Sequence, residues 1–314
     1  MKVLLIWLGK MWQFHLQNLI QIKQVSKIYA FDVIKENYKI ENDKIVYLNN
    51  LEDVTSIDQK ISINDIDFVD IVAPTKFHKS YLEIFIKNNK NIFVEKPIVS
   101  NLNEIKEIEK LIQETNYTWK IWVGFIERFN CVSKFFKQQI EERWKPKLIE
   151  IFRYNPWSDR IWDTDVTTDL MIHDLDLVNY FFDWKDIEIK GKNIENYSST
   201  VLLKSNNTNI TLSANRITQQ KIREIKFYYD DITITWDLML AKIDLYHKPS
   251  EYLSTRGQDL SITYMLEEKI LLKTNQLKEE LEEFVDIVNW WEYKNLSNIK
   301  NSINVTNTLD KLLK

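Results

Sequence analysis

The sequence of 314 residues is poor in cysteine, glycine and proline, with 1, 4 and 5 of them. The single cysteine, Cys131, excludes an internal disulfide bond. No group of Cys and His has zinc-ligand spacing, so we expect no metal site and favour a reducing, cytoplasmic location. No run of about 18 apolar residues occurs either, and we therefore expect no membrane-spanning segment.

The sequence also lacks a large excess of charge of either sign. The net charge is -4, with 44% hydrophobic and 28% charged residues, which is typical of a globular protein. This balance argues against a nucleic acid or an anionic membrane surface as partner. The length favours two domains, because single hydrophobic cores stop growing at roughly 250 to 300 residues.

The scarcity of glycine has a counterpart in an excess of tryptophan, with 4 Gly and 11 Trp. Glycine usually makes up about 7% of a chain. Several tryptophans stand where turns favour glycine, in Pro156-Trp157-Ser158, Asp183-Trp184-Lys185 and Asn289-Trp290-Trp291-Glu292. Our hypothesis is that the gene reads UGA as glycine, as some bacterial lineages do, and that the codons were translated as Trp. The alternative is that the tryptophans are real and their positions coincidental.

Apolar strands and polar-faced helices alternate over the first 125 residues. This alternation predicts a parallel, doubly wound sheet, and we assign residues 1–122 to a dinucleotide-binding Rossmann domain. Alternating runs later in the chain predict an α+β domain with an open, largely antiparallel sheet over residues 123–314. Whether the C-terminal helix packs back on the first domain stays open.

The first apolar strand leads into Trp7-Leu8-Gly9-Lys10-Met11-Trp12. Its spacing is that of a GxGxxG turn, which binds a dinucleotide pyrophosphate at a helix N-terminus, but tryptophan stands at the first and third glycine positions. Asp32 follows at the end of the second predicted strand, where a carboxylate binds ribose hydroxyls and repels a 2′-phosphate. The turn therefore predicts NAD rather than NADP as cofactor, with Asp32 as a simple loop cap as the alternative.

A second motif is Glu95-Lys96-Pro97, which ends another predicted strand of the first domain. Open α/β sheets bind ligands at the carboxyl ends of their strands, so Lys96 could donate a hydrogen bond to a substrate oxygen there. Taken alone, Lys96 could equally be a solvated surface lysine.

A third motif is Asp169-Leu170-Met171-Ile172-His173, which lies in a predicted helix. Asp169 and His173 are four residues apart and would share a helix face, as an imidazole base and its orienting carboxylate require. A histidine satisfied within the core is an equally good interpretation, and a metal-binding role is weaker.

Together these stretches resemble the Gfo/Idh/MocA family of nicotinamide-dependent sugar and inositol oxidoreductases, nearly throughout the chain and in the same order. The resemblance implies a Rossmann domain followed by an oligomer-forming α/β domain, with assembly into a homodimer or homotetramer. It implies Lys96, Asp169 and His173 as catalytic residues. It also implies a cofactor site formed by Trp7, Gly9, Lys10, Met11, Trp12, Asp32, Pro74, Thr75, His78, Glu95 and Lys96.

Within the family, the stretches at 123–130 and 159–163 look most like the branch that oxidises the C3 hydroxyl of UDP-N-acetylglucosamine. Substrate contacts are then expected from Arg128, Asn130, Arg153 and Arg160 beside Lys96, Asp169 and His173. Each arginine could equally be an ordinary ion-pair partner. The rival functions are an inositol or free-sugar dehydrogenase of the same family and a Rossmann-type sensor without turnover.

Overall fold

The computed structural model describes residues 1–6, 10–32, 40–55, 61–143, 145–157, 165–182, 187–248, 265–290 and 298–314. Its contacts divide the chain into two compact units. The first unit consists of Met1–Phe129 and Asn275–Asp310, and the second of Asn130–Thr274 and Lys311–Lys314.

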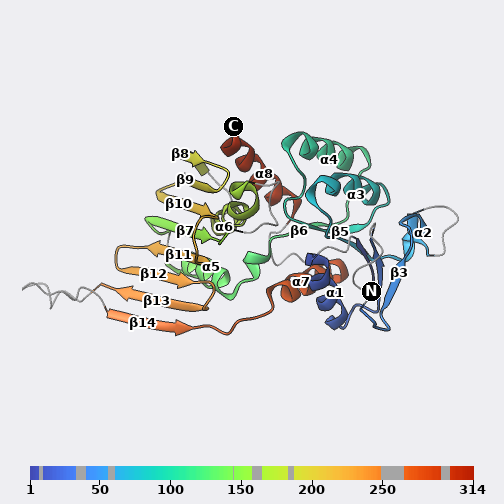
Figure 1. Cartoon of the computed structure of the whole chain (residues 1–314), viewed down its shortest axis with the longest axis horizontal. Helices are drawn as coiled ribbons and strands as arrows, with labels where there is room; N and C mark the ends of the chain where they lie inside the picture. The colour runs from blue at the N-terminus through green and yellow to red at the C-terminus, as the bar shows by residue number, and fades with distance from the viewer. Residues whose placement is uncertain are drawn as a thin grey trace, which may run out of the picture. The chain divides into compact units, whose positions relative to one another are not determined.

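The first unit contains a parallel sheet in the order β3-β2-β1-β4-β5-β6 (Figure 1). This is the strand order of a Rossmann fold, which places the switch point between β1 and β4. Strands β1, β4 and β5 are almost entirely buried, as expected of a parallel sheet covered on both faces. The strands are β1 (Lys2–Ile6), β2 (Lys27–Phe31), β3 (Ile45–Leu48), β4 (Phe68–Ile71), β5 (Asn91–Glu95) and β6 (Ile121–Gly124).

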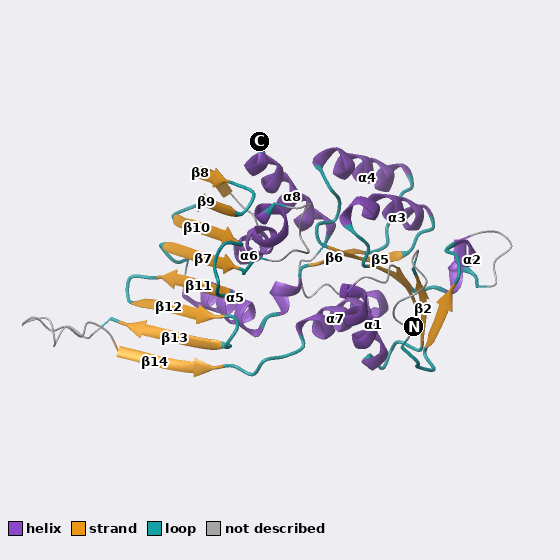
Figure 2. Ribbon diagram, in the orientation of Figure 1, coloured by secondary structure: helices purple, strands orange, loops and turns teal. Residues whose placement is uncertain are grey.

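Helices cover the two faces of this sheet in pairs. Helices α3 and α4 pack together on one face and α1 and α7 on the other, as Figure 2 shows. Asn101 caps α4 by accepting hydrogen bonds from the backbone N–H groups of Asn103 and Glu104. The helices are α1 (Lys10–Gln21), α2 (Glu52–Thr55), α3 (Thr75–Lys87), α4 (Leu102–Glu114), α7 (Gln276–Trp290) and α8 (Ile299–Leu313), of which α8 extends across the division at Asp310.

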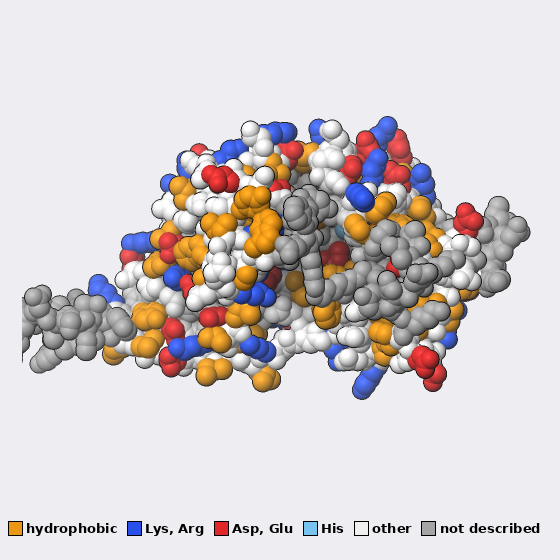
Figure 3. All heavy atoms as spheres, in the orientation of Figure 1, with side chains coloured by type: hydrophobic (Ala, Val, Ile, Leu, Met, Phe, Trp, Pro, Cys, Tyr) orange, Lys and Arg blue, Asp and Glu red, His pale blue; other side chains and the backbone are white. Residues whose placement is uncertain are grey.

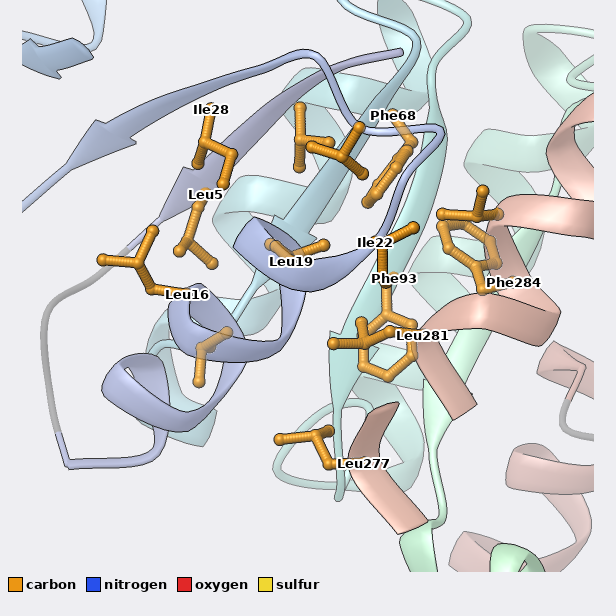
Figure 4. Close-up of a cluster of buried hydrophobic side chains, with 14 of the residues drawn as sticks. Leu5, Leu16, Leu19, Ile22, Ile28, Phe68, Phe93, Leu277, Leu281 and Phe284 are labelled. Atoms are coloured by element: carbon orange, nitrogen blue, oxygen red, sulfur yellow. The ribbon is translucent and has the colours of Figure 1, made fainter. Parts of the chain in front are cut away.

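The core under α1 joins two distant parts of the sequence. Leu16 and Leu19 of α1, Leu281 and Phe284 of α7 and Phe93 of β5 belong to one buried cluster (Figure 4). The ring of Phe284 also makes an edge contact with Phe93, at a centroid distance of 5.6 Å. Helix α7 is therefore part of the Rossmann core, although more than a hundred residues separate it from the rest.

The observed division differs from the predicted domain ranges at both ends of the second unit. A boundary after residue 122 would cut β6, whose residues Ile121–Gly124 pair in parallel with β5. Residues 275–310 fell within the predicted range of the second domain, with packing of the C-terminal helix on the first domain left open; they belong to the first unit, in which α7 packs on α1. The amphipathic pattern of a helix shows that one face is buried without showing which core it joins.

The second unit contains an eight-stranded sheet in the order β14-β13-β12-β11-β7-β10-β9-β8. Only the β7 and β10 pair is parallel, so the sheet is largely antiparallel as predicted. The α+β class is confirmed, whereas β13 and β14 were not predicted. The strands are β7 (Leu148–Tyr154), β8 (Ile187–Ile194), β9 (Ser198–Ser205), β10 (Thr208–Asn215), β11 (Ile222–Tyr228), β12 (Ile232–Asp237), β13 (Lys242–His247) and β14 (Met265–Ile270).

One face of this sheet is covered by α5 (Cys131–Arg143) and α6 (Ile172–Phe182). Phe136 of α5 packs against Phe227 of β11 and Trp236 of β12, with ring centroids 4.3 and 5.8 Å apart. Buried and partly exposed residues alternate along β7 and β12, which is the pattern of a sheet with one covered face.

The other face of the second sheet is polar and slightly hollowed. A depression of about 400 Å³ is lined by alternate residues of β11 to β13, including Lys226, Thr235 and Lys242. Lys226 pairs with Glu224, and Lys242 with Asp244. Figure 3 shows basic and acidic side chains interspersed over the visible face of the described residues.

Candidate active site

The cofactor turn is described only in part. Trp7 and Gly9 lie outside the described residues, so the structure does not test their predicted roles. Strand β1 ends at Ile6 and α1 begins at Lys10, which places a helix N-terminus directly after the first strand of the sheet. Met11 is exposed on the first turn of α1. This strand-turn-helix arrangement is the one that the sequence predicts for pyrophosphate binding.

Trp12 lies at the third glycine position of that turn. Its side chain is fully buried in the core cluster of the first unit, with Val3 and Leu5 of β1 among the other members. Its indole N–H has no hydrogen-bond partner among the described residues. An unsatisfied buried donor typically costs about 1 to 3 kcal/mol. The tryptophan therefore fills the space between α1 and the sheet, but at an energetic cost that glycine would avoid.

Asp32 follows β2 directly and is 7% exposed. Its charge contributes to raising the pKa of Tyr81, whose larger cause is burial. A carboxylate at the carboxyl end of β2, next to β1 in the sheet, lies where the ribose of a dinucleotide binds in this fold.

His78 connects the two loops that follow β4 and β5. It lies on α3, is 1% exposed, and its Nδ1 and Nε2 atoms lie 2.9 and 2.6 Å from the carbonyl oxygens of Pro97 and Ala73. Burial lowers the pKa of His78, against the opposing effect of these carbonyls. The ring thus contacts the backbone of both loops, and its predicted contact with the cofactor stays a prediction. Pro74 and Thr75 begin the same helix.

The Glu95-Lys96 motif stands at the carboxyl end of β5, and a buried histidine holds its carboxylate. His15 of α1 lies between two acidic side chains: Nδ1 is 2.9 Å from Asp70 Oδ2, and Nε2 is 3.1 Å from Glu95 Oε1. His15 and Asp70 are fully buried, and Glu95 is 14% exposed. Glu95 Oε2 accepts a hydrogen bond from the backbone N–H of Lys96 at 3.3 Å.

Gly124 leaves the space that the Glu95 carboxylate occupies. A Cβ atom at this position in β6 would lie 2.8 Å from Glu95 Oε1 and 3.1 Å from Phe93 Cε1. Such distances are too short for a side chain, so glycine is required here by close packing. The prediction identified Gly124 only as part of a resembling stretch, and it missed His15 and Asp70 entirely.

Asp169 of the second unit lies in one turn of π-helix, Thr167–Met171, that precedes α6. Its carboxylate accepts a hydrogen bond from Arg216 Nη2, at 2.5 Å from Oδ2. Arg216 follows β10 and is almost completely buried. Isolated π-helical turns occur frequently at functional sites. No pattern in the sequence singles out Arg216, because it is remote from the motif in the chain.

His173 is the second residue of α6, which begins directly after this wide turn, and it is partly exposed. The π-helical turn changes the angular step between residues, so the spacing of four from Asp169 is not that of a regular α-helix. Asp165 fixes the start of the turn by accepting hydrogen bonds from the backbone N–H groups of Thr167 and Thr168, at 2.8 and 2.9 Å. The predicted orientation of His173 by Asp169 stays a prediction.

Two of the expected substrate contacts have structural roles within their own units. Arg153 of β7 is 2% exposed and donates from Nε to Asp174 Oδ1 at 2.7 Å. Asn130 accepts a hydrogen bond from the backbone N–H of Val132 at the start of α5, at 3.1 Å. The structure thus favours the ion-pair alternative for Arg153, here a buried pair, and a helix-capping role for Asn130.

Arg128 lies in the 3-10 helix Ile126–Phe129 and is fully buried, with its guanidinium 5.4 Å from the centroid of the Phe125 ring. Arg160 lies outside the described residues. Within the described ranges, no cluster of three or more His, Cys, Asp or Glu could hold a metal ion. None of the described helices is long and apolar enough to span a membrane.

The described residues form a Rossmann sheet with a Glu-Lys pair at the end of β5, and a second, largely antiparallel sheet. Residues 1–125 match the model of a family described as "Oxidoreductase family, NAD-binding Rossmann fold". The match covers the Rossmann part of the chain, in which the cofactor turn and the Glu95-Lys96 motif lie.

Similar proteins cover most of the chain at low identity. UDP-N-acetylglucosamine 3-dehydrogenase of Acidithiobacillus ferrooxidans is 23% identical over 92% of this chain and 88% of its own. A scyllo-inositol 2-dehydrogenase (NAD(+)) of Bacillus subtilis is 31% identical, over 40% of this chain and 38% of its own.

Solved structures show the same fold. The Acidithiobacillus ferrooxidans enzyme superimposes with a TM-score of 0.79 at 21% identity, over 99% of this chain and 96% of that chain. A 3-ketoreductase from Actinomadura kijaniata, in complex with TDP-benzene and NADP, gives a TM-score of 0.78 at 11% identity, over 100% and 97%.

Proposed function

We propose that the protein is an NAD-dependent sugar dehydrogenase that oxidises the C3 hydroxyl of UDP-N-acetylglucosamine or a related nucleotide sugar to a ketone. The observation that carries this proposal is the placement of Lys96. It follows a β5 carboxylate held between Gly124, His15 and the Lys96 backbone, at the edge of the Rossmann sheet where ligands bind. A solvated surface lysine has no need of such a support.

The residues present fit a bound dinucleotide. The N-terminus of α1 is suited to the pyrophosphate, and Asp32 at the end of β2 is suited to the ribose hydroxyls. Because Asp32 would repel a 2′-phosphate, the proposal specifies NAD rather than NADP. When bound, NAD supplies the nicotinamide that accepts the hydride from the sugar carbon.

The protein's own groups manage the proton and the orientation of the substrate. The Lys96 ammonium donates a hydrogen bond to the reacting oxygen and stabilises negative charge that develops on it. His173 accepts the hydroxyl proton, which requires a neutral imidazole. Asp169, held by Arg216, places a carboxylate in the π-helical turn that leads into α6, the helix that carries His173.

The nucleotide sugar is favoured by the relative from Acidithiobacillus ferrooxidans, which matches over most of both chains. The inositol dehydrogenases match a smaller part of this chain, as the 40% covered by the Bacillus subtilis enzyme illustrates. Assembly into a homodimer or homotetramer and a cytoplasmic location remain predictions from the sequence.

The test uses a protein in which glycine is restored in the cofactor turn, Trp7→Gly with Trp12→Gly. It is incubated with NAD or NADP and a panel of nucleotide sugars, free sugars and inositols, and reduction of the cofactor is followed by absorbance. We expect turnover with NAD and UDP-N-acetylglucosamine, with the 3-ketone as product. A protein that binds NAD but turns over only inositols would contradict the substrate, and one inactive on the whole panel would contradict the enzyme.

The codons at the eleven tryptophans test the recoding hypothesis separately. UGA at positions 7 and 12 is expected, together with a natively made protein lighter than the printed sequence predicts. UGG at these positions would refute recoding, and the unmodified chain would then be the one to assay.

A further inference from the structure

A buried chain of three titratable side chains connects helix α1 to the loop that carries Lys96. His15 reaches from α1 toward Asp70 of β4 and Glu95 of β5, and these two strands are neighbours in the sheet. The ring of His15 also meets Phe93 edge-on, at a centroid distance of 5.6 Å. The network (His15, Asp70 and Glu95) therefore lies within the first unit, one residue from Lys96.

His15 must carry a positive charge to donate a hydrogen bond from each ring nitrogen to a carboxylate. A neutral imidazole has one N–H, whereas an imidazolium donates from both nitrogens. Each ring nitrogen here faces a carboxylate oxygen. Burial alone would lower the pKa of His15, but Asp70 and Glu95 outweigh this effect and raise it to about 10. Burial also raises the pKa of Asp70, against the opposing charge of His15.

The Glu95 carboxylate has two partners. His15 contacts Oε1 and the backbone N–H of Lys96 donates to Oε2, while the carboxylate occupies the space that Gly124, without a side chain, leaves open. A carboxylate that bridges a buried cation and a backbone amide fixes the chain where it leaves β5. The position of the Lys96 backbone is thus linked to a side chain on a different element.

We propose that His15 and Asp70 are positioning residues for Lys96, which they hold in its reactive geometry by fixing the Glu95 carboxylate. His15 acts on Glu95 directly, and Asp70 acts through His15. This inference rests on the proposed catalytic role of Lys96, because a support of this kind matters for turnover only if Lys96 acts on the substrate. The competing explanation is that the network only attaches α1 to the sheet.

The variants His15→Gln and Asp70→Asn distinguish these explanations in the full chain. Glutamine cannot provide a cation between two carboxylates, and Asp70→Asn keeps the side-chain size but removes one carboxylate. Leu19→Ala is the matched control, because Leu19 is fully buried on the same helix and lies outside the network. All three variants are expected to lose stability.

The first readout needs no activity. Amide hydrogen exchange at Lys96 reports whether its N–H still binds Glu95, with the amide of Val94 in β5 as internal reference. The exchange ratio is the exchange rate of the Lys96 amide divided by that of the Val94 amide. We expect this ratio to rise by about 3- to 10-fold in His15→Gln and Asp70→Asn, as loss of one hydrogen bond predicts. In Leu19→Ala the ratio should stay at its parent value.

The second readout is turnover on the substrate that the panel identifies. In His15→Gln and Asp70→Asn we expect kcat to fall by roughly 10- to 100-fold, the cost of misplacing a catalytic group by about 1 Å, with NAD affinity unchanged. Asp70 and Glu95 are the charged groups facing His15, so Asp70→Asn should also move the alkaline limb of the kcat profile to lower pH. The control should keep the parent profile.

The outcomes separate this inference from the proposed function. If both network variants behave like Leu19→Ala in exchange ratio, kcat and pH profile, the network is only structural and the inference fails. If the parent protein is inactive on the whole panel, the proposed function fails, and an unchanged Lys96 exchange ratio would then overturn the positional link as well. A variant that does not fold is replaced by the other of the pair.

Discussion

The two units of this chain bury charge in different ways. In the first unit, the buried network ends at the strand terminus that carries Lys96, and its third member is partly exposed. In the second unit, Arg153 and Asp174 form a pair with side-chain exposures of 3% and 0%, between a strand and the helix that covers it. The first arrangement adjoins Lys96, which we propose to act on the substrate, whereas the second joins a strand to the helix that covers it.

The sheets explain this difference. A parallel sheet covered on both faces offers ligands only its carboxyl edge, so buried polar groups can act at that edge. An open sheet with one covered face has a wide interface with its helices, where buried polar groups join layers. The ion pair of Arg216 and Asp169 in the second unit is less buried than that of Arg153 and Asp174, because the side-chain exposures of Asp169 and Arg216 are 29% and 3%.

The largest expected effect on turnover is that of replacing Lys96. Lys96→Met keeps the length of the side chain and removes its ammonium group, so we expect kcat to fall by about 10²- to 10⁴-fold. NAD affinity and thermal stability should change little. Steady-state kinetics and equilibrium binding of NAD provide the measurement, and an equal loss of kcat and NAD affinity would indicate a structural role for Lys96.

A large effect on stability without loss of chemistry is expected in the second unit. Asp174→Asn leaves Arg153 buried without its anionic partner, which typically costs about 3 to 5 kcal/mol. Hydrogen exchange of amides in β7 and β10 measures this locally and avoids assuming that a two-unit chain unfolds in one step. Lys110→Ala, which breaks an exposed pair with Glu114, is the control and should have little effect.

An intermediate effect is expected at the partly exposed pair. Arg216→Met removes the guanidinium that holds Asp169, so we expect kcat to fall by roughly 10-fold, with a smaller loss of stability than in Asp174→Asn. The measurements are kcat for Arg216→Met and the loss of stability in Arg216→Met and in Asp174→Asn. If Arg216→Met changed stability alone, the pair would resemble Arg153 and Asp174 and would have no part in catalysis.

The last prediction concerns the pH dependence of stability. The pKa of His15 is raised from 6.5 to about 10, so its contribution is complete below pH 6.5 and is lost as the pH rises toward 10. We therefore expect the difference in unfolding free energy between the parent and His15→Gln to narrow over that interval. Denaturant titrations at several pH values measure it, and a constant difference would show that His15 is not charged in the folded state.

The sequence predicted the fold class and the motifs well, because strand-helix alternation and strand-end motifs are local patterns. It could not find Arg216 or Asp70, whose importance depends on neighbours that are distant in the chain. His15 is close to the cofactor turn, yet nothing nearby shows that it faces Glu95. The buried partner of Arg153, Asp174, was likewise beyond the sequence, since a pattern does not show which side chain faces a strand residue.

The place of α7 in the core of the first unit has a consequence for synthesis of the chain. Leu277, Leu281 and Phe284 close the apolar cluster over α1, and residues 130–274 are made before them (Figure 4). At roughly 5 to 20 residues per second, the ribosome needs on the order of ten seconds for this stretch. During that interval the N-terminal segment has an open apolar surface, so chaperone binding to nascent chains should decrease once α7 has emerged.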